Sequence, residues 1–414
     1  MRCYPAEGQV PEDCYTTEGK RPESVHSVED ERAEGTIMEQ VRQPRRVLAG
    51  VGRAVVVLVS ATALGASALG WTAYRGVTVA VTTDDVIAAP ATPPSREKAA
   101  AADTTFLLVG VDSRTDAQGR PLSREILDEL QAGNPSGEQN TDTMIVVHVP
   151  ADPTKKAFAV SLPRDSYVDI AGGYGKHKLN SAYSRAKNAN GGSATAGRRN
   201  LIETVNNLTG LRVNHYAEIN MYAFSQITKA VGGVPICLNK AVKDNYSGAD
   251  FPQGEQVLQG ADALKFVRQR HGLPRGDLDR VRRQQAFLAG LASRVLSAGT
   301  LTDPGKVTAL LDAIKTSVVL DQNWNLLSLA EQVQGLSGGR IEFHTIPTLR
   351  SDLATPADGT AVEVNPKQVK AFVQDLLTAV PAPPVQMRQG LGSGTVAPEQ
   401  HQETITANGV HCVN

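Results

Sequence analysis

The fold is decided by the stretch Thr-Phe-Leu-Leu-Val-Gly-Val at residues 105–111. It is apolar without alternation, which is typical of a strand buried on both faces of its sheet. Residues 143–149 and 157–162 have the same character and predict two further central strands. Asp112 follows the first strand, and Asp142 precedes the second. If these two strands are antiparallel neighbours, both carboxylates lie at the same edge of the sheet.

Two carboxylates that converge at one edge need a cation between them. Oxygen ligands near phosphate groups favour Mg²⁺, so Asp112 and Asp142 are candidate metal ligands. The alternative for each residue alone is an ordinary aspartate in a turn. The residues between them, 113–141, are polar and form an excursion between two core strands.

Segments with helical spacing of apolar residues alternate with the apolar strands. Helices interleaved with apolar strands are typical of an α/β domain. We therefore predict a central mixed sheet flanked by helices, an α-β-α sandwich. The expected helices are 122–131, 200–208, 222–231, 285–296, 306–317, 326–336 and 366–377, and the expected additional strands are 215–220 and 340–346.

The most basic part of this domain is residues 264–285, LKFVRQRHGLPRGDLDRVRRQQ, which hold six arginines although the net charge of the chain is only -1. Arginines pack together when an anion lies between them, and the guanidinium fork matches phosphate oxygens. An extended segment at 266–270 would put Arg268 and Arg270 on one face. The alternative is a solvated basic helix face, which is the usual role of a charge run.

A helix that begins near Gly276 would carry one polar stripe. Asp277, Arg280 and Gln284 would then fall at positions i, i+3 and i+7. The buried side of this helix would be supplied by apolar residues, namely Leu278, Val281, Phe287, Leu288 and Leu291.

Two further polar segments lie near strand ends. A predicted strand ends in Ser-Leu-Pro-Arg-Asp at 161–165, so Arg164 and Asp165 lie where α/β domains place functional groups. A local ion pair is the alternative. Residues 175–183, Gly-Lys-His-Lys-Leu-Asn-Ser-Ala-Tyr, form a basic loop that contains Lys178 and leads into a helix. A solvated turn is the alternative for this loop.

An uncharged run from Ala54 to Tyr74, roughly 20 residues, is long enough to cross a bilayer as a helix. Four arginines precede it, so the positive-inside rule predicts a cytoplasmic N-terminus and an extracellular C-terminal domain in a single-pass membrane protein. A cleaved signal peptide is the alternative, but the run begins deep in the chain and is too long for a signal core. The expected parts are a disordered cytoplasmic tail (1–46), a transmembrane anchor (47–75), an extracellular linker (76–103), a catalytic domain (104–380) and a flexible tail (381–414).

The four cysteines divide between the two predicted sides of the membrane. Cys3 and Cys14 lie on the cytoplasmic side, where thiols stay reduced. Cys237 and Cys412 lie outside, where a disulfide would tie the C-terminal tail to the domain; two unpaired thiols are the alternative. The sequence has no Cys/His cluster with zinc-like spacing, no GxGxxG and no P-loop.

Taken together, these segments resemble the LytR-CpsA-Psr family of membrane-anchored cell-wall enzymes. The matching motifs occur in the family's order from about residue 104 to residue 296. They are LLVGVDSR at 107–114, DTMIV at 142–146, SLPRD at 161–165, KLNSAY at 178–183, GGVP at 232–235, FPxG at 251–254, ALKFVRQR at 263–270 and GDLxRxxRQQ at 276–285. High Ala, Val, Gly and Arg content favours an actinobacterial source.

The resemblance implies a phosphotransferase that attaches a cell-wall glycopolymer, carried on polyprenyl pyrophosphate, to peptidoglycan through a phosphodiester bond. Asp112 and Asp142 would hold Mg²⁺, with Mn²⁺ as the alternative ion. The catalytic residues implied are Arg164, Arg268, Arg270 and Asp277, and the pyrophosphate-binding residues are Arg114, Lys178, Arg280 and Gln284. Asp277 is expected to orient Arg280 rather than to act as a base.

The chain departs from the family pattern at Asn140, where many relatives carry an arginine, so one cationic contact to the phosphates is either missing or supplied by Arg114. The polyprenyl chain would need an apolar cleft, expected between the helices of 199–231 and the first core strands. A polyprenyl-pyrophosphate hydrolase and a non-catalytic regulator or lipid-binding protein are the alternatives. Nucleic acid is not an expected partner, because residues 1–44 are too short, acidic and aperiodic for a helix-turn-helix.

Overall fold

The computed structural model describes residues 81–87, 102–133, 140–152, 154–301, 303–322, 324, 341–378 and 404–414. The predicted tail at 1–46, the predicted anchor at 47–75 and the predicted helix at 326–336 lie outside these residues. Within the described ranges, no helix combines the length and the apolar character that a membrane span requires.

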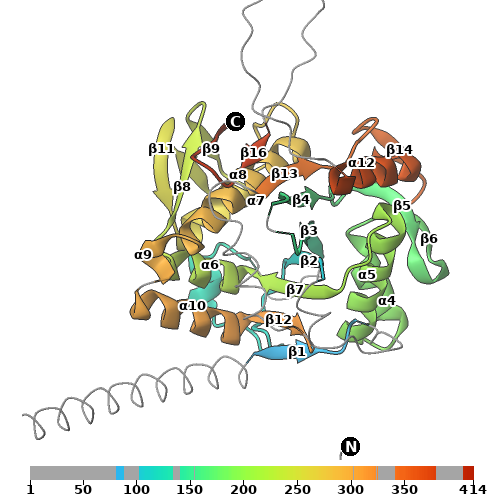
Figure 1. Ribbon diagram of the computed structural model, residues 1–414, viewed down its shortest axis with the longest axis horizontal. Coiled ribbons are helices and arrows are strands. Elements are labelled where there is room, and N and C mark those ends of the chain that lie inside the picture. Colours follow the sequence, from blue (N-terminus) through green and yellow to red (C-terminus); the bar gives the residue numbers. More distant parts are fainter. Residues whose placement is uncertain are drawn as a thin grey trace, which may run out of the picture. The chain divides into compact units, whose positions relative to one another are not determined.

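In the described part of the chain, eight strands form the central sheet, in the order β1-β12-β7-β2-β3-β4-β13-β16 (Figure 1). Strand β2 is antiparallel to β3 and parallel to β7, so the sheet is mixed, as predicted. The strands are β1 (Thr82–Asp84), β2 (Thr104–Val111), β3 (Thr141–Val149), β4 (Ala157–Ser161), β7 (His215–Asn220), β12 (Val318–Asp321), β13 (Ile341–Thr345) and β16 (Ile405–Thr406).

Helices cover both faces of this sheet (Figure 1). On one face, Leu107 and Val109 of β2 belong to a core with α4 (Ser181–Ala189), α5 (Ala194–Thr209) and α12 (Pro366–Thr378). The opposite face packs against the other major helices, because side chains alternate along each strand. These helices are α6 (Met221–Ala230), α7 (Gly260–Arg268), α8 (Asp277–Val295) and α10 (Pro304–Ser317).

Smaller elements surround the central sheet. They are short, none longer than six residues, so they are too short for a clear periodicity in the sequence. The excursion at 113–141 contains α3 (Arg124–Glu129). The others are β5 (Ser166–Ile170), η1 (Ala171–Gly173), β6 (Gly175–Lys178), β8 (Val234–Leu238), β9 (Val242–Asp244), β10 (Ala249–Phe251), β11 (Gly254–Leu258), α9 (Ala298–Leu301), β14 (Leu353–Thr355), β15 (Gly359–Glu363) and β17 (Cys412–Val413).

The prediction of an extended segment at 266–270 is wrong for residues 266–268, which are helical. Helix α7 continues to Arg268, and the backbone becomes extended only at Gln269. Ala263 and Phe266, three residues apart on one helix face, are buried against the core of the central sheet, and Leu264 is buried against α3. This packing on two sides decides the helical conformation.

Two segments expected outside the core take part in sheets. Residues 82–84, within the expected linker, pair as β1 with β12. Near the other end, β16 pairs with β13, and β17 pairs with β8. A disulfide between Cys237 and Cys412 joins β8 to β17, so residues 404–414 of the expected flexible tail pack on the domain.

Candidate functional site

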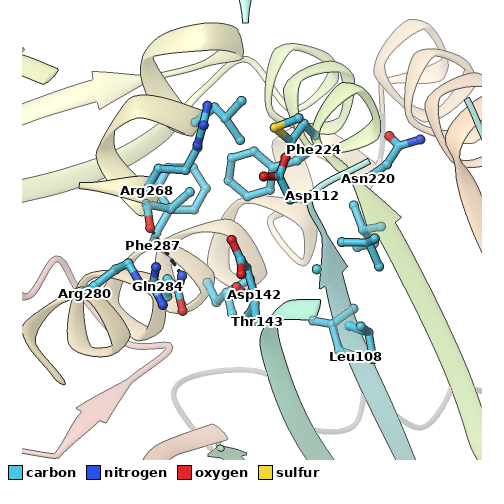
Figure 2. A pocket seen from close by; sticks show the side chains of 18 residues that line it. Leu108, Asp112, Asp142, Thr143, Asn220, Phe224, Arg268, Arg280, Gln284 and Phe287 are labelled. Atoms are coloured by element: carbon cyan, nitrogen blue, oxygen red, sulfur yellow. Dashed lines mark hydrogen bonds between the residues drawn. The ribbon is translucent and has the colours of Figure 1, made fainter. Parts of the chain in front are cut away.

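A pocket lies between the sheet strands β2, β3 and β7 and the helices α6, α7 and α8 (Figure 2). Its cavity volume is about 130 Å³. The walls are mainly aliphatic and aromatic, whereas the charged residues gather at the mouth. The lining residues are Leu108, Val109, Gly110, Val111, Asp112, Asp142, Thr143, Ile219, Asn220, Met221, Phe224, Leu264, Val267, Arg268, Arg280, Gln284, Phe287 and Leu288.

The two aspartates reach the mouth because β2 and β3 are antiparallel neighbours, as the sequence analysis expected. The pairing shifts register between Gly110 and Val111, and the amide of Asp112 donates a 3.1 Å hydrogen bond to the carbonyl of Asn140. Asn140, the departure from the family pattern, thus contributes a backbone contact that any residue at this position could make. Figure 2 shows both carboxylates at the mouth, with Arg268, Arg280 and Gln284 around them.

Burial raises the pKa of Asp112 above its ordinary value. Arg114, whose guanidinium lies 3.6 Å from the Asp112 carboxylate, acts in the opposite direction, and the charge of Asp142 raises the pKa further. The arginines nearby therefore do not fully offset the cost of burying the Asp112 carboxylate. A ligand that brought a cation would favour its ionised form.

The helix α8 begins at Asp277, after Gly276 at a φ of 53°. A residue with a side chain is disfavoured at this positive φ, so glycine suits the helix start. One turn later, Arg280 Nη2 lies 2.6 Å from Asp277 Oδ1, and Arg280 is only 5% exposed. Burial lowers the pKa of Arg280, and Asp277 opposes this effect. The expected polar stripe of Asp277, Arg280 and Gln284 is present, and Gln284 also lines the pocket.

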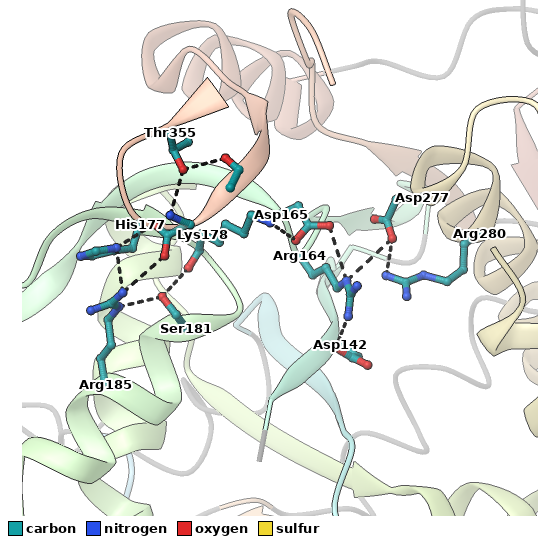
Figure 3. A network of polar contacts seen from close by, with 12 residues as sticks. Asp142, Arg164, Asp165, His177, Lys178, Ser181, Arg185, Asp277, Arg280 and Thr355 are labelled. Carbon is teal, nitrogen blue, oxygen red and sulfur yellow. Dashed lines mark hydrogen bonds and ion pairs between the residues drawn. The ribbon is translucent and has the colours of Figure 1, made fainter. Parts of the chain in front are cut away.

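Arg164, just beyond β4, connects the two acidic parts of the mouth (Figure 3). Its Nη1 donates a 2.7 Å hydrogen bond to Asp142, and its Nε lies 3.8 Å from Asp277 and 3.6 Å from Asp165. Burial alone would lower the pKa of Arg164, but Asp142 and Asp165 outweigh it, so the pKa is raised. Lys178 lies 3.3 Å from Asp165 and extends the network away from the pocket.

Several buried polar atoms of this network have no hydrogen-bond partner within the described part of the chain. They are Asp112 Oδ1, both carboxylate oxygens of Asp277, Arg164 Nε and Arg280 Nε. Asp277 Oδ1 is in ion-pair contact with Arg280 but not in hydrogen-bond geometry. Buried polar groups are nearly always hydrogen-bonded, so such atoms indicate a site completed by a ligand.

No group of three or more His, Cys, Asp and Glu side chains that could hold a metal occurs among the described residues. Asp112 and Asp142 nevertheless suit a hard cation, because one buried oxygen of Asp112 lacks a partner. Mg²⁺ is commonly bound by one or two carboxylates, with water and substrate phosphate supplying the other ligands. The residues present therefore fit a magnesium ion that arrives with a phosphate substrate.

The remaining candidate residues are Arg268, Arg114 and Arg270, of which only Arg268 lines the pocket. Arg268 lines the pocket, and its Nη1 lies 3.4 Å from the carbonyl oxygens of Leu130 and Gln131. Arg114 Nε donates to the carbonyl of Ala132 at 3.0 Å. Arg270 is exposed in the loop after α7 and is not brought to the pocket. Because α7 ends at Arg268, Arg270 lies beyond the helix and is not part of the pocket lining.

The alternative of a solvated basic helix face is wrong for α8, because Arg283 as well as Arg280 is buried. The Arg283 guanidinium lies 5.1 Å from the centre of the Phe266 ring, and its Nε donates to the backbone oxygen of Asn414. Burial lowers the pKa of Arg283 to about 10. Arg283 thus stabilises the packing of α8 and the chain end rather than the pocket.

The pocket walls differ in part from the cleft expected between the helices of 199–231 and the first strands. Helix α6 and β2 do contribute, but α5 covers the other face of the sheet. Helices α7 and α8 supply the missing wall through Val267, Phe287 and Leu288. Asn220 was not foreseen: it caps α6 by accepting from the amide of Ala223 at 2.7 Å and lies beside the mouth. An Asn directly before a helical pattern is the signal that could have identified it.

Comparisons with known proteins show the family of this chain. A model of the LytR_cpsA_psr family matches residues 76–376. The chain is 44% identical over 350 residues to the cell wall biosynthesis protein LcpA of Corynebacterium glutamicum, which covers 80% of this chain and 67% of LcpA. It is 37% identical over 183 residues to the polyisoprenyl-teichoic acid–peptidoglycan teichoic acid transferase TagU of Enterococcus faecalis, covering 44% of this chain and 56% of TagU.

Solved structures share the fold at low sequence identity. A LytR-Csp2A-Psr enzyme from Actinomyces oris is similar with a TM-score of 0.51 and 18% identity, over 72% of this chain and 95% of that one. A Streptococcus agalactiae protein is similar with a TM-score of 0.53 and 21% identity, over 69% of this chain and 90% of that one. Identities this low support the mixed α/β fold alone.

Proposed function

Because the chain belongs to the LytR-CpsA-Psr family, we propose that it transfers a cell-wall glycopolymer from a polyprenyl-pyrophosphate carrier to peptidoglycan. The observation that carries the proposal is an apolar pocket lined by Asp112 and Arg280, each of which has a buried polar atom without a hydrogen-bond partner among the described residues. A prenyl chain suits the apolar walls, and a pyrophosphate suits the arginines at the mouth. One substrate that is apolar at one end and anionic at the other matches both features.

The acceptor for this reaction is a peptidoglycan hydroxyl. Its oxygen forms a bond to the phosphorus that carries the glycan, and the bond from that phosphorus to the lipid phosphate breaks. The hydroxyl proton leaves to solvent or to the departing phosphate. The product is a phosphodiester, and the lipid keeps one phosphate.

The chain's own residues contribute chiefly charge and position. Arg280 and Arg268 contact the pyrophosphate oxygens, and Gln284 orients them from the same wall. Arg164 shares Asp142 and Asp277 with this group, so it holds both acidic residues in place as charge moves to the leaving phosphate. Asp277 orients Arg280, in keeping with their 2.6 Å contact.

Asp112 and Asp142 would hold Mg²⁺, which neutralises pyrophosphate charge when bound. The support is the raised pKa of Asp112, caused first by burial, together with its unpartnered oxygen. We further propose that Lys178 and Arg114 bind substrate phosphate at the edge of the site. Residues 47–75 would anchor the domain on the outer side of the cell membrane.

The test uses the full 414-residue chain with a polyprenyl-pyrophosphate-linked glycan, peptidoglycan fragments and Mg²⁺. We expect a phosphodiester-linked glycan–peptidoglycan product that is lost in Asp142→Ala and in Arg268→Ala. Arg199→Ala, an exposed arginine that contacts Asp85, is the matched control and should keep full activity.

Two outcomes would contradict the transferase. Release of lipid phosphate or glycan phosphate without any linked product would indicate the hydrolase instead. Absence of turnover, with tight lipid binding retained in both pocket variants, would indicate a lipid-binding protein.

A further inference from the structure

The side chain of Tyr246 is 82% exposed, the highest value among the large apolar side chains recorded as exposed in the described ranges. Its ring is nevertheless stacked on His271, with 4.2 Å between ring centres and an interplanar angle of 28°. Burial therefore does not explain this aromatic pair. Tyrosine rings are enriched at binding surfaces, because they combine an apolar face with a polar hydroxyl.

The turn that carries Tyr246 connects β9 to β10 and is fixed by one buried carboxylate. Asp244, 5% exposed, accepts hydrogen bonds from the amide of Tyr246 at 2.9 Å and from the hydroxyl of Ser247 at 2.8 Å. These bonds satisfy the polar groups of the turn. The ring of Tyr246 is thus presented to solvent by a turn that has little freedom of its own.

Two connections link the stacked pair to Arg268 of the pocket lining. His271 is three residues after Arg268, which lines the pocket. On the other side, Gly248 is so close to Gln131 that an added Cβ would lie 1.9 Å from Gln131 Oε1. The carbonyl of Gln131 in turn faces Arg268 at 3.4 Å.

Gln131 has an unusual backbone for a residue with a side chain, at a φ of 49°. The end of α3 explains it: Gln131 follows the C-cap residue Leu130, and the amides of Gln131 and Ala132 donate to the carbonyls of Asp128 and Leu127 at 3.2 and 2.9 Å, as in a Schellman motif. Gln131 is exposed, so its side-chain amide is available beside the hairpin. Gln131 is thus connected through its carbonyl to Arg268 at the pocket, and the exposed Arg270 directly precedes His271 in the same loop.

We propose that the stacked rings of Tyr246 and His271 bind a sugar ring of a saccharide substrate, either the donor glycan or the peptidoglycan acceptor. A pyranose ring has an apolar face of C–H groups, which packs on an aromatic ring, and hydroxyls at its edge. The amide of Gln131 and the guanidinium of Arg270 are suited to those hydroxyls or to anionic substituents on them. This inference rests on the proposed function, because the glycan is part of either the donor or the acceptor.

Direct binding tests the platform without turnover. The probes are chitotetraose and a disaccharide–tetrapeptide from digested peptidoglycan, titrated into the full chain. We expect Tyr246→Ala to raise the dissociation constant of at least one probe by about three- to tenfold. Tyr246→Trp should retain binding, because it keeps the ring. Leu349→Ala removes another exposed apolar side chain and is the matched control, which should bind like the wild type.

Kinetics identify which substrate the platform holds. With prenyl-pyrophosphate donors that carry one or four sugars, loss of the donor contact raises KM only for the longer donor and leaves kcat unchanged. Loss of the acceptor contact raises KM only for the peptidoglycan fragment. Either pattern supports a saccharide subsite and names its occupant.

The proposal is overturned if the wild type binds neither probe, or if Tyr246→Ala binds both as the wild type does and keeps both KM values. Saccharide binding that depends on Tyr246 in a protein that forms no linked product would support the platform while contradicting the transferase. The two proposals can therefore fail separately. Thermal unfolding of Tyr246→Ala should match the wild type, because the ring contributes little buried area.

Discussion

The two faces of the central sheet each hold a buried arginine among carboxylates, but the two clusters differ in how completely they are paired. On the α5 face, Arg198 donates two 2.8 Å hydrogen bonds to Glu218 and one of 2.6 Å to Asp84. The hydroxyl of Tyr216 donates to the same Glu218 at 2.8 Å, and Thr195 donates to Asp84 at 2.8 Å. All four carboxylate oxygens of this cluster accept a hydrogen bond.

On the pocket face, Arg280 and Arg164 lie among Asp277, Asp142 and Asp112, yet several of their polar atoms lack a partner among the described residues. Burial is similar, since the side chains of Arg198 and Arg280 are 12% and 7% exposed. The clusters differ in hydrogen bonding rather than in depth. A fully paired buried cluster stabilises the fold, whereas an incompletely paired one is suited to binding a charged ligand.

The largest effect is expected from breaking the paired cluster. Glu218→Ala leaves Arg198 with Asp84 alone and removes the acceptor of the fully buried Tyr216. Removing one partner of a buried ion pair costs about 3–5 kcal/mol in the free energy of unfolding. Urea denaturation measures this loss, and Glu203→Ala, an exposed glutamate on the helix α5 that carries Arg198, is the control. A loss below about 1 kcal/mol would mean that the cluster is not a major source of stability.

The second prediction is that substitution of Arg280 lowers activity strongly and stability little. Arg280→Met should lower the rate of product formation by about 10²–10³-fold, because a preorganised donor to the developing phosphate charge is lost. Its free energy of unfolding should change by less than about 1 kcal/mol, since the burial of Arg280 is incompletely compensated. Steady-state kinetics and urea denaturation of the same variant provide both values. Strong destabilisation without loss of rate would place Arg280 with Arg198 as a structural residue.

The third prediction concerns divalent cations. Mg²⁺ in about hundredfold excess over its dissociation constant should raise the free energy of unfolding of the wild type by about 2–3 kcal/mol. Asp112→Asn should remove most of this gain, because the variant lacks one of the two carboxylates. Differential scanning calorimetry with and without Mg²⁺ measures the difference. Asp84→Asn, in the paired cluster, is the control: it should be less stable but should still respond to Mg²⁺.

The smallest effect is expected in the pH dependence of stability without added cations. Burial raises the pKa of Asp112 in the folded protein above its ordinary value of 3.8. The contribution of Asp112 to stability is therefore complete below pH 3.8 and is lost as the pH rises through its raised pKa. Asp112→Asn removes this loss, so the free energy of unfolding of the variant should rise relative to that of the wild type between acid and neutral pH. Parallel stability curves for the two proteins would contradict the assignment.

Sequence reasoning was most successful where local pattern fixes burial. The continuous apolar runs predicted β2, β3 and β4, and β2 and β3 prove to be the antiparallel neighbours that bring Asp112 and Asp142 to one edge. The same kind of reasoning failed at Arg270, because the end of a helix depends on what packs against it. Neither β1 nor β17 was foreseen, since strands of two or three residues carry no usable periodicity.

By itself, the sequence determined the buried strands, the polar stripe of Asp277, Arg280 and Gln284, and the ordered motifs that identify the family, because periodicity and spacing are local properties of the chain. Only the tertiary structure decided which charged residues pair with which. Arg198 reaches Glu218 and Asp84 from distant parts of the chain, whereas Arg280 meets Asp277 and stays incompletely bonded. Hydrogen-bond completeness depends on distances and angles between separate elements, so the difference between a stabilising cluster and a binding site appears only in the folded molecule.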